Sequence, residues 1–259
     1  MNQKWSRSQW EAEISAVSPI QQPLKMVDAI RRIDTSTVPY MLADENENVY
    51  VVKCRLRNRP TCSYLVTEQI VARIGVAMGA PVVQPALVYV GQDLISNNTN
   101  IFTPSSTYPG IAHATLYVKH CTDSDFGDRL PNNRIGYALL TYLYELACCQ
   151  TDHQVIINSA KQVLSVDHGE CFYNGPDWSI ETLQNTPCQC IYESLSEKIE
   201  LTRRERDSAI AAVAGITNSQ IAEAVAAPPT EWQVDDECRL TLAELLALRR
   251  DSIVEKHSA

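Results

Sequence analysis

The chain has 259 residues, 45% of them hydrophobic and 20% charged, which is typical of a globular protein and excludes extensive disorder or a fibrous repeat. Its 22 basic and 31 acidic residues give a formal net charge of -9 at pH 7, so the chain as a whole repels polyanions. No apolar run approaches the roughly 20 residues of a membrane-spanning helix. We therefore expect neither direct nucleic-acid binding nor a membrane span.

The first 24 residues are polar and weakly patterned, and residues 1–24 are interpreted as an N-terminal extension. They lack the apolar core of a signal peptide, which predicts a cytoplasmic protein. Because the cytoplasm is reducing, the nine cysteines are expected to be free thiols. Neither the adjacent Cys148 and Cys149 nor the C-x-C of Cys188 and Cys190 has the spacing of a zinc site.

Residues 25–119 are β-rich and form a predicted N-lobe. Short β-type runs on either side of Asp28 lead into the segment 34–37, and this order indicates a strand, a turn and a second strand. Two further β-rich runs, at 40–43 and 49–52, flank a five-residue polar insert of the kind that closes a hairpin. The second strand of this hairpin would end at Lys53.

A helical period follows, in which Ile70, Ile74 and Ala77 recur at three- and four-residue steps and share one face. Glycine and proline then end the helix. β-type residues return at 82–90 and 114–118, on either side of an irregular loop rich in Asn, Ser, Thr and Pro.

Residues 120–259 form a predicted helical C-lobe. Helices are expected at 134–149, 193–200, 203–214, 219–226 and 240–256, with Thr217 as the N-cap of the fourth. Between the first two helices, runs at 155–157 and 163–166 predict a β-hairpin. The sequence therefore predicts an α+β, two-lobed protein-kinase-like fold with a β-rich N-lobe and a helical C-lobe that carries an embedded hairpin.

This order of parts suits a phosphotransferase, because a small sheet clamps ATP while a helical lobe offers catalytic carboxylates. The run 50–53 resembles the kinase strand whose lysine, here Lys53, reaches the nucleotide phosphates. Fifteen positions later, Glu68 lies off the apolar stripe of its helix and is able to pair with Lys53. Such a pair would hold a flexible lysine in place. Taken singly, each residue is equally consistent with a solvated side chain.

Two aspartates lie at the open ends of the predicted hairpin, Asp152 before it and Asp167 after it. Strands of similar length bring these ends together, so both carboxylates would reach one phosphate group. In a kinase the first orients the attacking hydroxyl and the second holds Mg²⁺. Gly169 allows a backbone turn that a side chain would obstruct. Loop residues without a chemical role are the alternative.

With these residues assembled, the chain resembles the HipA-like kinases, particularly their short single-module branch. The resemblance extends from about residue 33 to residue 253 and is most specific in the D-H-G segment at 167–169 and the P-x-E-W segment at 229–232. It implies a two-lobed kinase fold with Mg-ATP as phosphoryl donor. It also implies that the acceptor is a serine or threonine hydroxyl of a protein.

The resemblance assigns a role to each candidate residue. Lys53 would contact the phosphates and Glu68 would hold it, Asp152 would be the catalytic base, and Asp167 would be the main Mg²⁺ ligand. The family's second metal ligand is an asparagine, whereas this chain has Gln154 near that position, with the same amide oxygen on a longer arm.

The loop expected to cover the phosphates also departs from the family. Its hydroxyl residues Thr35, Ser36 and Thr37 and their backbone N–H groups are candidates for nucleotide binding. The loop has no glycine, which makes close approach of backbone to phosphate harder.

Two alternatives stay open. A catalytically weak or inactive pseudokinase would use the fold for nucleotide binding and regulation, because the altered loop around Asp152 is where inactivation would show. A metal-dependent hydrolase could be built on Asp152, His153, Asp167 and His168, but this leaves Lys53 and Glu68 without a role. A protein substrate is expected, and an antitoxin or regulatory partner would be encoded elsewhere.

Overall fold

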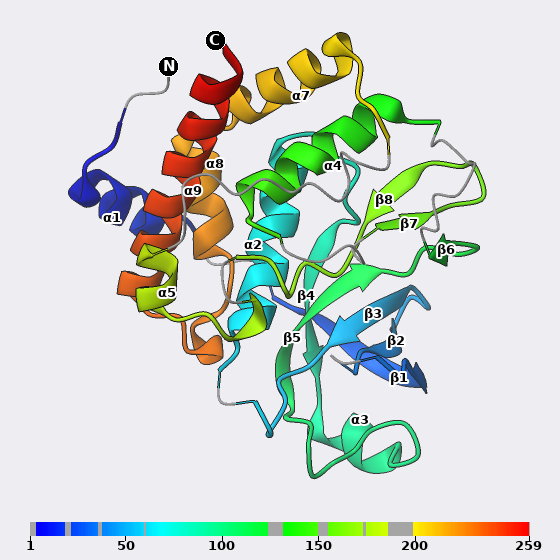
Figure 1. The fold of residues 1–259 in the computed structure, drawn as a ribbon. Helices are drawn as coiled ribbons and strands as arrows, with labels where there is room; N and C mark the ends of the chain where they lie inside the picture. Colours follow the sequence, from blue (N-terminus) through cyan, green and yellow to red (C-terminus); the bar gives the residue numbers. More distant parts are fainter. Residues whose placement is uncertain are drawn as a thin grey trace.

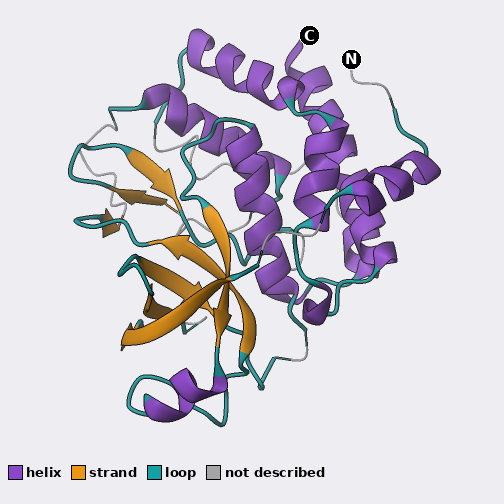
Figure 2. Cartoon of the chain, turned by 180° about the vertical axis from the view of Figure 1, so that it is seen from behind, coloured by secondary structure: helices purple, strands orange, loops and turns teal. Residues whose placement is uncertain are grey.

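The structure is a computed structural model of the chain. It describes residues 4–18, 22–35, 38–59, 61–123, 132–149, 155–172, 175–185 and 199–258. A strand-rich part and a helical part lie side by side, with one long helix between them (Figures 1 and 2). The predicted mixed α+β architecture is confirmed.

The strand-rich part is a closed barrel. Its strands are β1 (Leu24–Arg32), β2 (Tyr40–Asp44), β3 (Val49–Lys53), β4 (Pro85–Val90) and β5 (Gly110–Leu116). They close in the order β1, β2, β3, β5, β4, with β1 parallel to β4 and every other pair antiparallel. The barrel interior is filled by Tyr40, Leu42, Val52 and Val88, which are fully buried.

The predicted hairpin that ends at Lys53 is confirmed as β2 and β3. The runs on either side of Asp28 form the single strand β1, which pairs antiparallel with β2. This pairing slips between Met26 and Asp28 and again between Ala29 and Arg31, as at β-bulges.

Helix α2 (Ser63–Ala77) lies between the barrel and the helical part (Figure 1). It packs against β4 and β5 on one side and against α4 and α8 on the other. The apolar stripe predicted from Ile70 and Ile74 is buried, but so are most other positions of the helix. A short helix, α3 (Gln92–Asn97), precedes the irregular loop and was not predicted.

The helical part contains α4 (Arg134–Leu146), α5 (Ile180–Gln184), α7 (Arg203–Gly215), α8 (Asn218–Ala226) and α9 (Asp236–Ser258), with 3₁₀ turns η1 (Gly175–Asp177) and η2 (Thr230–Trp232). Thr217 caps α8 as predicted, its hydroxyl accepting the backbone N–H of Gln220 at 3.2 Å. The helix predicted at 193–200 lies almost entirely outside the described residues.

No helix was predicted in residues 1–24, but α1 (Arg7–Ala16) lies within them and packs on α8 and α9. Ser6 and Gln9 form a capping box at its start, and Trp10 buries its ring against the other helices. In the described part of the chain no single helix has the length and apolar composition of a membrane span, although α7 and α8, bent by 73°, meet that test as a pair.

The embedded hairpin is confirmed as β7 (Val155–Ile157) and β8 (Val163–Ser165), with β6 (Thr122–Asp123) added at its edge. The hairpin is attached to the segment that follows α2. Ser165 donates its backbone N–H to the carbonyl of Pro81 at 2.8 Å and accepts that of Val83 at 3.1 Å. The end of β8 is thereby fixed relative to the helix that carries Glu68.

Candidate active site

Three charged side chains from distant parts of the sequence meet beside the end of β3. Lys53 is the last residue of that strand, paired in the ladder with His113 of β5. Its buried ammonium Nζ donates to Glu68 Oε1 on α2 and, at 2.5 Å, to Asp167 Oδ1 after β8. The pairing of Lys53 with Glu68 expected from their spacing is therefore present, and Asp167 joins it.

Glu68 is 1% exposed, and both of its carboxylate oxygens are used. Oε1 accepts from Lys53, and Oε2 accepts the backbone N–H of His168 at 2.7 Å. The chain passes so close here that a Cβ at Gly169 would lie 3.1 Å from Glu68 Oε1. The backbone turns here as expected, with Cys171 donating its N–H to the carbonyl of His168 at 3.0 Å. Glycine at 169 also allows this close approach, which a larger residue would crowd.

Burial acts against both charges of the Lys53 and Glu68 pair, because it lowers the pKa of the lysine and raises that of the glutamate. The attraction of the carboxylates of Glu68 and Asp167 outweighs burial and raises the pKa of Lys53. The attraction of Lys53 likewise lowers the pKa of Glu68. Both groups are charged at neutral pH, so the site contains a buried ion pair in which the Lys53 cation is held in a fixed position.

Two histidines flank Glu68, and the sequence did not predict that either of them would lie there. His113 Nε2 and His168 Nδ1 lie 3.7 and 3.8 Å from Glu68 Oε2. Burial lowers the pKa of both imidazoles. Gln69 donates its amide to the carbonyl of Ala86 at 2.8 Å and to His113 Nδ1 at 2.9 Å, which leaves the His113 proton on Nε2, facing Glu68.

The sequence does contain a signal for His113, which is a lone titratable residue in an apolar β-run. Its place opposite Lys53 depends on the register of β3 with β5, which are separated by more than fifty residues.

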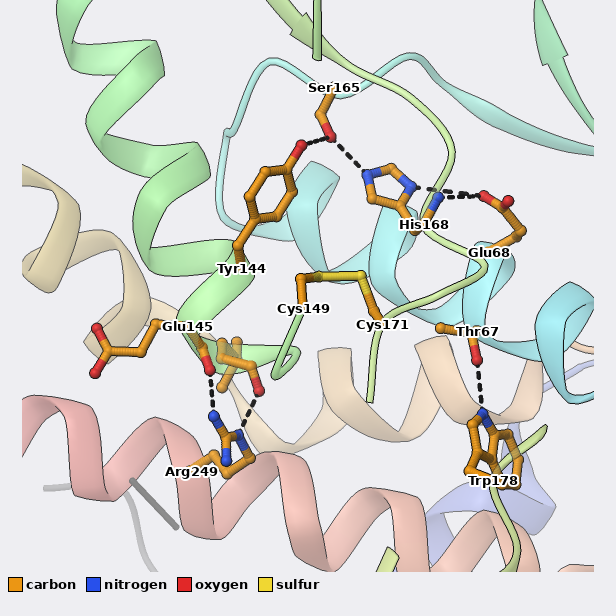
Figure 3. The surroundings of a disulfide bond; sticks show 11 residues. Thr67, Glu68, Tyr144, Glu145, Cys149, Ser165, His168, Cys171, Trp178 and Arg249 are labelled. Carbon is orange, nitrogen blue, oxygen red and sulfur yellow. Dashed lines mark hydrogen bonds and ion pairs between the residues drawn. A yellow bond between two sulfur atoms is a disulfide. The ribbon is translucent and has the colours of Figure 1, made fainter. Parts of the chain in front are cut away.

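The ring of His168 faces the protein interior (Figure 3). Its Nε2 bonds to Ser165 Oγ at 2.7 Å, and Ser165 Oγ bonds to the Tyr144 hydroxyl at 2.5 Å. The other ring nitrogen, Nδ1, faces Glu68 at 3.8 Å, and the side chain is 2% exposed. This burial and these neighbours disfavour His168 as the metal ligand that the hydrolase alternative needs.

Asp167 differs from its two partners in being partly open to solvent, with 43% of its side chain exposed. Its backbone lies in the left-handed region at φ 58°, which aspartate tolerates better than most residues. Only Oδ1 is engaged by another of the described residues, so Oδ2 is available to a hard cation such as Mg²⁺. Asp167 thus fits the metal-binding role predicted for it.

The other predicted members of the site cannot be compared in the same way. Asp152, the predicted base, and Gln154, the predicted second metal ligand, lie outside the described residues, as do Ser36 and Thr37. Within the described ranges no group of three His, Cys, Asp or Glu side chains converges on a metal position. Thr35 is exposed, in a turn closed by the backbone bond from Val38 N to Thr35 O at 3.1 Å.

The expectation of free thiols is wrong for one pair, because Cys149 and Cys171 form a disulfide (Figure 3). The end of α4 and the segment after β8 are brought together, and Phe172 donates its backbone N–H to the carbonyl of Ala147 at 2.7 Å. The bridge joins the chain three residues before Asp152 to the chain four residues after Asp167. A cytoplasmic location stays a prediction, and a disulfide persists more readily in an oxidising compartment.

Two further contacts hold the ends of this bridge. Arg249 of α9 donates to the carbonyls of Leu146, at 2.7 Å, and Glu145, and so caps the end of α4 before Cys149. Beyond Cys171, the indole N–H of Trp178 donates to Thr67 Oγ1 on α2 at 2.8 Å. Figure 3 shows both contacts around the bridge. The segment that holds Asp167 is thus fixed from several directions.

Comparisons with known proteins identify the fold. No family model matches the chain, and no curated protein matches it. Its structure is similar to that of a Helicobacter pylori proinflammatory kinase, CtkA, with a TM-score of 0.59, 13% sequence identity, and coverage of 88% of this chain and 93% of that one. It is also similar to the Golgi casein kinase, with a TM-score of 0.51, 11% identity, and coverage of 98% and 78%.

A structure of the Golgi casein kinase with Mn and ADP bound matches similarly, with a TM-score of 0.51, 10% identity, and coverage of 97% and 74%. At these identities the likeness concerns the fold alone. The chain has the protein-kinase-like fold, as predicted. Membership of the HipA-like branch stays a prediction.

Proposed function

We propose that this protein is an Mg-ATP-dependent phosphotransferase that transfers the γ-phosphate to a serine or threonine hydroxyl of a protein. The observation that carries the proposal is the meeting of Lys53, Glu68 and Asp167 in a protein-kinase-like fold. Kinases of that fold use a phosphate-binding lysine, a glutamate that pairs with it and a metal-binding aspartate. Lys53, Glu68 and Asp167 correspond to these three residues. The manganese and ADP of one structural neighbour are consistent with this assignment.

The geometry suits phosphate binding by Lys53. An ammonium group has three N–H donors, and Glu68 and Asp167 accept two of them. The third is available to a phosphate oxygen without breaking the pair with Glu68. Because the ammonium is buried and held on both sides, it needs little reorganisation to meet the phosphate charge.

The remaining roles follow from the residues around this cation. Asp167 would hold Mg²⁺ through Oδ2, and bound Mg²⁺ neutralises phosphate charge. Asp152 would orient the acceptor hydroxyl and take its proton, and Gln154 would assist Asp167. Thr35, Ser36 and Thr37 would cover the phosphates with hydroxyls and backbone N–H groups. A regulatory partner encoded elsewhere remains part of the proposal.

The test is incubation with γ-labelled ATP and Mg²⁺, scored for self-labelling and for transfer to a generic acidic protein. Thermal unfolding with and without Mg-ATP measures nucleotide binding separately. We expect Asp167→Asn to abolish labelling and to reduce the stabilisation. Asp152→Ala should spare the stabilisation and stop the labelling. Asp207→Asn is the matched control, because Asp207 of α7 is 64% exposed and lies away from the candidate nucleotide-binding residues, paired with Arg203.

The outcomes separate the candidates. Labelling by wild type and Asp207→Asn but not by Asp167→Asn supports the kinase. Stabilisation by Mg-ATP without labelling at any substrate concentration supports the pseudokinase. Absence of both for the wild-type protein would overturn the assignment of Lys53 and Asp167 to a nucleotide site.

A further inference from the structure

The loop between β3 and α2 concentrates positive charge in an acidic protein. Arg55, Arg57 and Arg59 occupy alternate positions of a five-residue stretch, whereas the chain as a whole has a net charge of -9. Within the described ranges none of the three lies within ion-pair distance of a carboxylate. Arg32, Arg134 and Arg250, by contrast, each have such a partner.

Aromatic rings hold the three guanidinium groups in place. The Arg57 guanidinium carbon lies 4.1 Å from the centre of the Tyr108 ring, and that of Arg55 lies 5.2 Å from the same ring. The Arg59 guanidinium lies 4.9 Å from the ring of Tyr64. An aromatic ring attracts a cation through its face, but it does not remove the repulsion between two neighbouring guanidinium groups. An anion bound between the guanidinium groups would remove this repulsion.

The backbone under this cluster is also fixed. Leu56 bridges to Thr107, and Arg57 donates its N–H to the carbonyl of Ser106 at 2.8 Å. Tyr108 returns a bond to the carbonyl of Arg55 at 3.0 Å. The arginine side chains therefore project from two segments that are already hydrogen-bonded to each other, which lowers the entropic cost of binding a ligand.

Two of the arginine nitrogens are buried without a hydrogen-bond acceptor, Arg55 Nε and Arg59 Nη1. Buried donors of this kind are costly, and most are satisfied in native proteins. Glu231 of the neighbouring turn η2 directs its Oε1 to the backbone N–H of Ile111 at 2.7 Å, and it forms no ion pair with the three arginines among the described residues. The described part of the cluster thus has two buried donors without an acceptor and no carboxylate at ion-pair distance.

A phosphate monoester supplies both. It carries nearly two negative charges and three acceptor oxygens, and guanidinium groups bind it through paired N–H donors. A carboxylate has one negative charge and two acceptor oxygens, which neutralises and bonds fewer of the three guanidinium groups than a phosphate does. A nucleic-acid strand is disfavoured, because three cations on a protein of net charge -9 do not make a groove that tracks a backbone.

The cluster is directly connected to the candidate active site. Arg55 follows Lys53 by two residues, and Tyr64 lies one helical turn before Glu68. The Tyr64 hydroxyl donates to the carbonyl of Cys54 at 2.6 Å, joining the end of β3 to the start of α2. In Figure 1 this connection lies at the lower edge of the molecule, away from α7.

We propose that Arg55, Arg57 and Arg59, backed by Tyr108 and Tyr64, form a binding site for a phosphorylated serine or threonine side chain. The phosphate has two possible sources, this chain after self-phosphorylation or another protein. The site goes beyond the proposed phosphotransfer, since binding at the arginines requires no catalysis. It would let the protein recognise a segment that has already been phosphorylated.

The test measures binding of a short fluorescent peptide with one phosphoserine, together with its serine and glutamate counterparts, by anisotropy. We expect the phosphopeptide to bind best and Arg57→Gln to weaken it at least about tenfold, the loss typical of a charge-assisted hydrogen bond. Arg57→Lys, which keeps the charge but not the paired donors, should give a smaller loss. Arg203→Gln is the matched control, because Arg203 is 91% exposed and should have no effect.

Further arms identify the source of the phosphate. If the chain fills its own site, phosphatase treatment of the wild-type protein raises its affinity for the peptide. If another protein brings the phosphate, the treatment changes nothing and the phosphopeptide still binds. Thermal unfolding of each variant confirms that the fold is intact.

Three results would overturn the proposal. They are equal binding of the serine peptide, unchanged binding by Arg57→Gln together with Arg55→Gln, or displacement of the phosphopeptide by a single-stranded RNA of equal affinity. Loss of Mg-ATP stabilisation with intact phosphopeptide binding would count against the phosphotransferase alone. The reverse would count against the arginine site alone.

Discussion

Lys53 ends strand β3 and Asp167 follows strand β8, and both lie at the candidate active site. The two side chains differ in how far they are buried and in how they are held. Lys53 lies within the barrel ladder, and its side chain is 6% exposed and held by Glu68. Asp167 lies beyond β8 in a left-handed backbone conformation, and its side chain is 43% exposed. The Lys53 cation is thus held by protein contacts alone, whereas the Asp167 carboxylate keeps a side open to solvent.

Replacing Lys53 should break this arrangement most severely. Lys53→Met leaves Glu68 buried without its cation, and loss of one partner from a buried pair costs about 3 to 5 kcal/mol. Asp167→Asn removes a half-exposed charge and should cost less than about 1 kcal/mol. Urea unfolding followed by circular dichroism measures both free energies of unfolding.

The double variant Lys53→Met with Glu68→Leu is the control for the Lys53 prediction. It removes the unpaired charge, so the protein should recover much of the stability lost in the single variant. Equal costs for Lys53→Met and Asp167→Asn would show that the two ends of the site are held alike, contrary to the geometry.

The disulfide is expected to have the next largest effect. Cys149 and Cys171 are 22 residues apart, and closing a loop of that length stabilises a fold by about 3 kcal/mol. Cys149→Ala with Cys171→Ala should lose most of this, measured by urea unfolding without reductant. Cys54→Ala, at a buried free thiol, is the matched control and should lose only the contribution of side-chain burial.

Reductant sharpens the same measurement. It should destabilise the wild-type protein and Cys54→Ala but leave the double cysteine variant unchanged. Equal sensitivity of all three proteins to reductant would show that the bridge does not support the segment around Asp167.

Local patterns predicted most of what determines the Lys53 end of the site. Alternation and a polar insert predicted the hairpin that ends at Lys53, and helical spacing located Glu68 on the next helix. Both are short-range features, for which sequence periodicity is a direct physical signal. The adjacent strands β7 and β8 predicted only that Asp167 would lie near Asp152, which is outside the described residues, whereas its contact with Lys53 joins residues 114 positions apart.

Long-range contacts were not predictable in this way. His113 meets Lys53 through strands that pair only when the barrel closes, and Cys149 meets Cys171 only after α4 and the β8 loop pack together. No spacing rule encodes either contact. The prediction of free thiols was wrong for Cys149 and Cys171 for a further reason, because it rested on the expected cellular compartment and not on the positions of the cysteines in the fold.

Gly169→Ala tests how tightly the Asp167 end is packed against Glu68. An added Cβ would lie 3.1 Å from Glu68 Oε1, a fully buried atom that already holds Lys53. We expect destabilisation of about 1 to 3 kcal/mol from overpacking and a fall in any phosphotransfer activity. Gly215→Ala is the control, since a Cβ there meets nothing within 4 Å. Equal stability of the two variants would contradict the close approach.

The smallest expected effect on stability concerns His113, which lies opposite Lys53 in the pairing of β3 with β5. Burial is the main cause that holds its pKa well below the ordinary value, with Lys53 acting in the same direction. His113 is therefore neutral in the folded protein while the unfolded chain takes up a proton below about pH 6.5. Because the unfolded state binds more protons, stability should fall as the pH falls through that value. The loss attributable to His113 is about 0.7 kcal/mol between pH 7 and pH 6.

The measurement is the slope of the free energy of unfolding against pH over this interval, where carboxylates are already ionised. His113→Gln should flatten the slope by that amount whatever its effect on absolute stability. His120→Gln should leave the slope unchanged, because His120 is exposed. An unchanged slope in His113→Gln would show that the imidazole opposite Lys53 takes up a proton in the folded state. Lys53 would then tolerate a second positive charge at its side, which burial of the imidazole and repulsion from the Lys53 ammonium argue against.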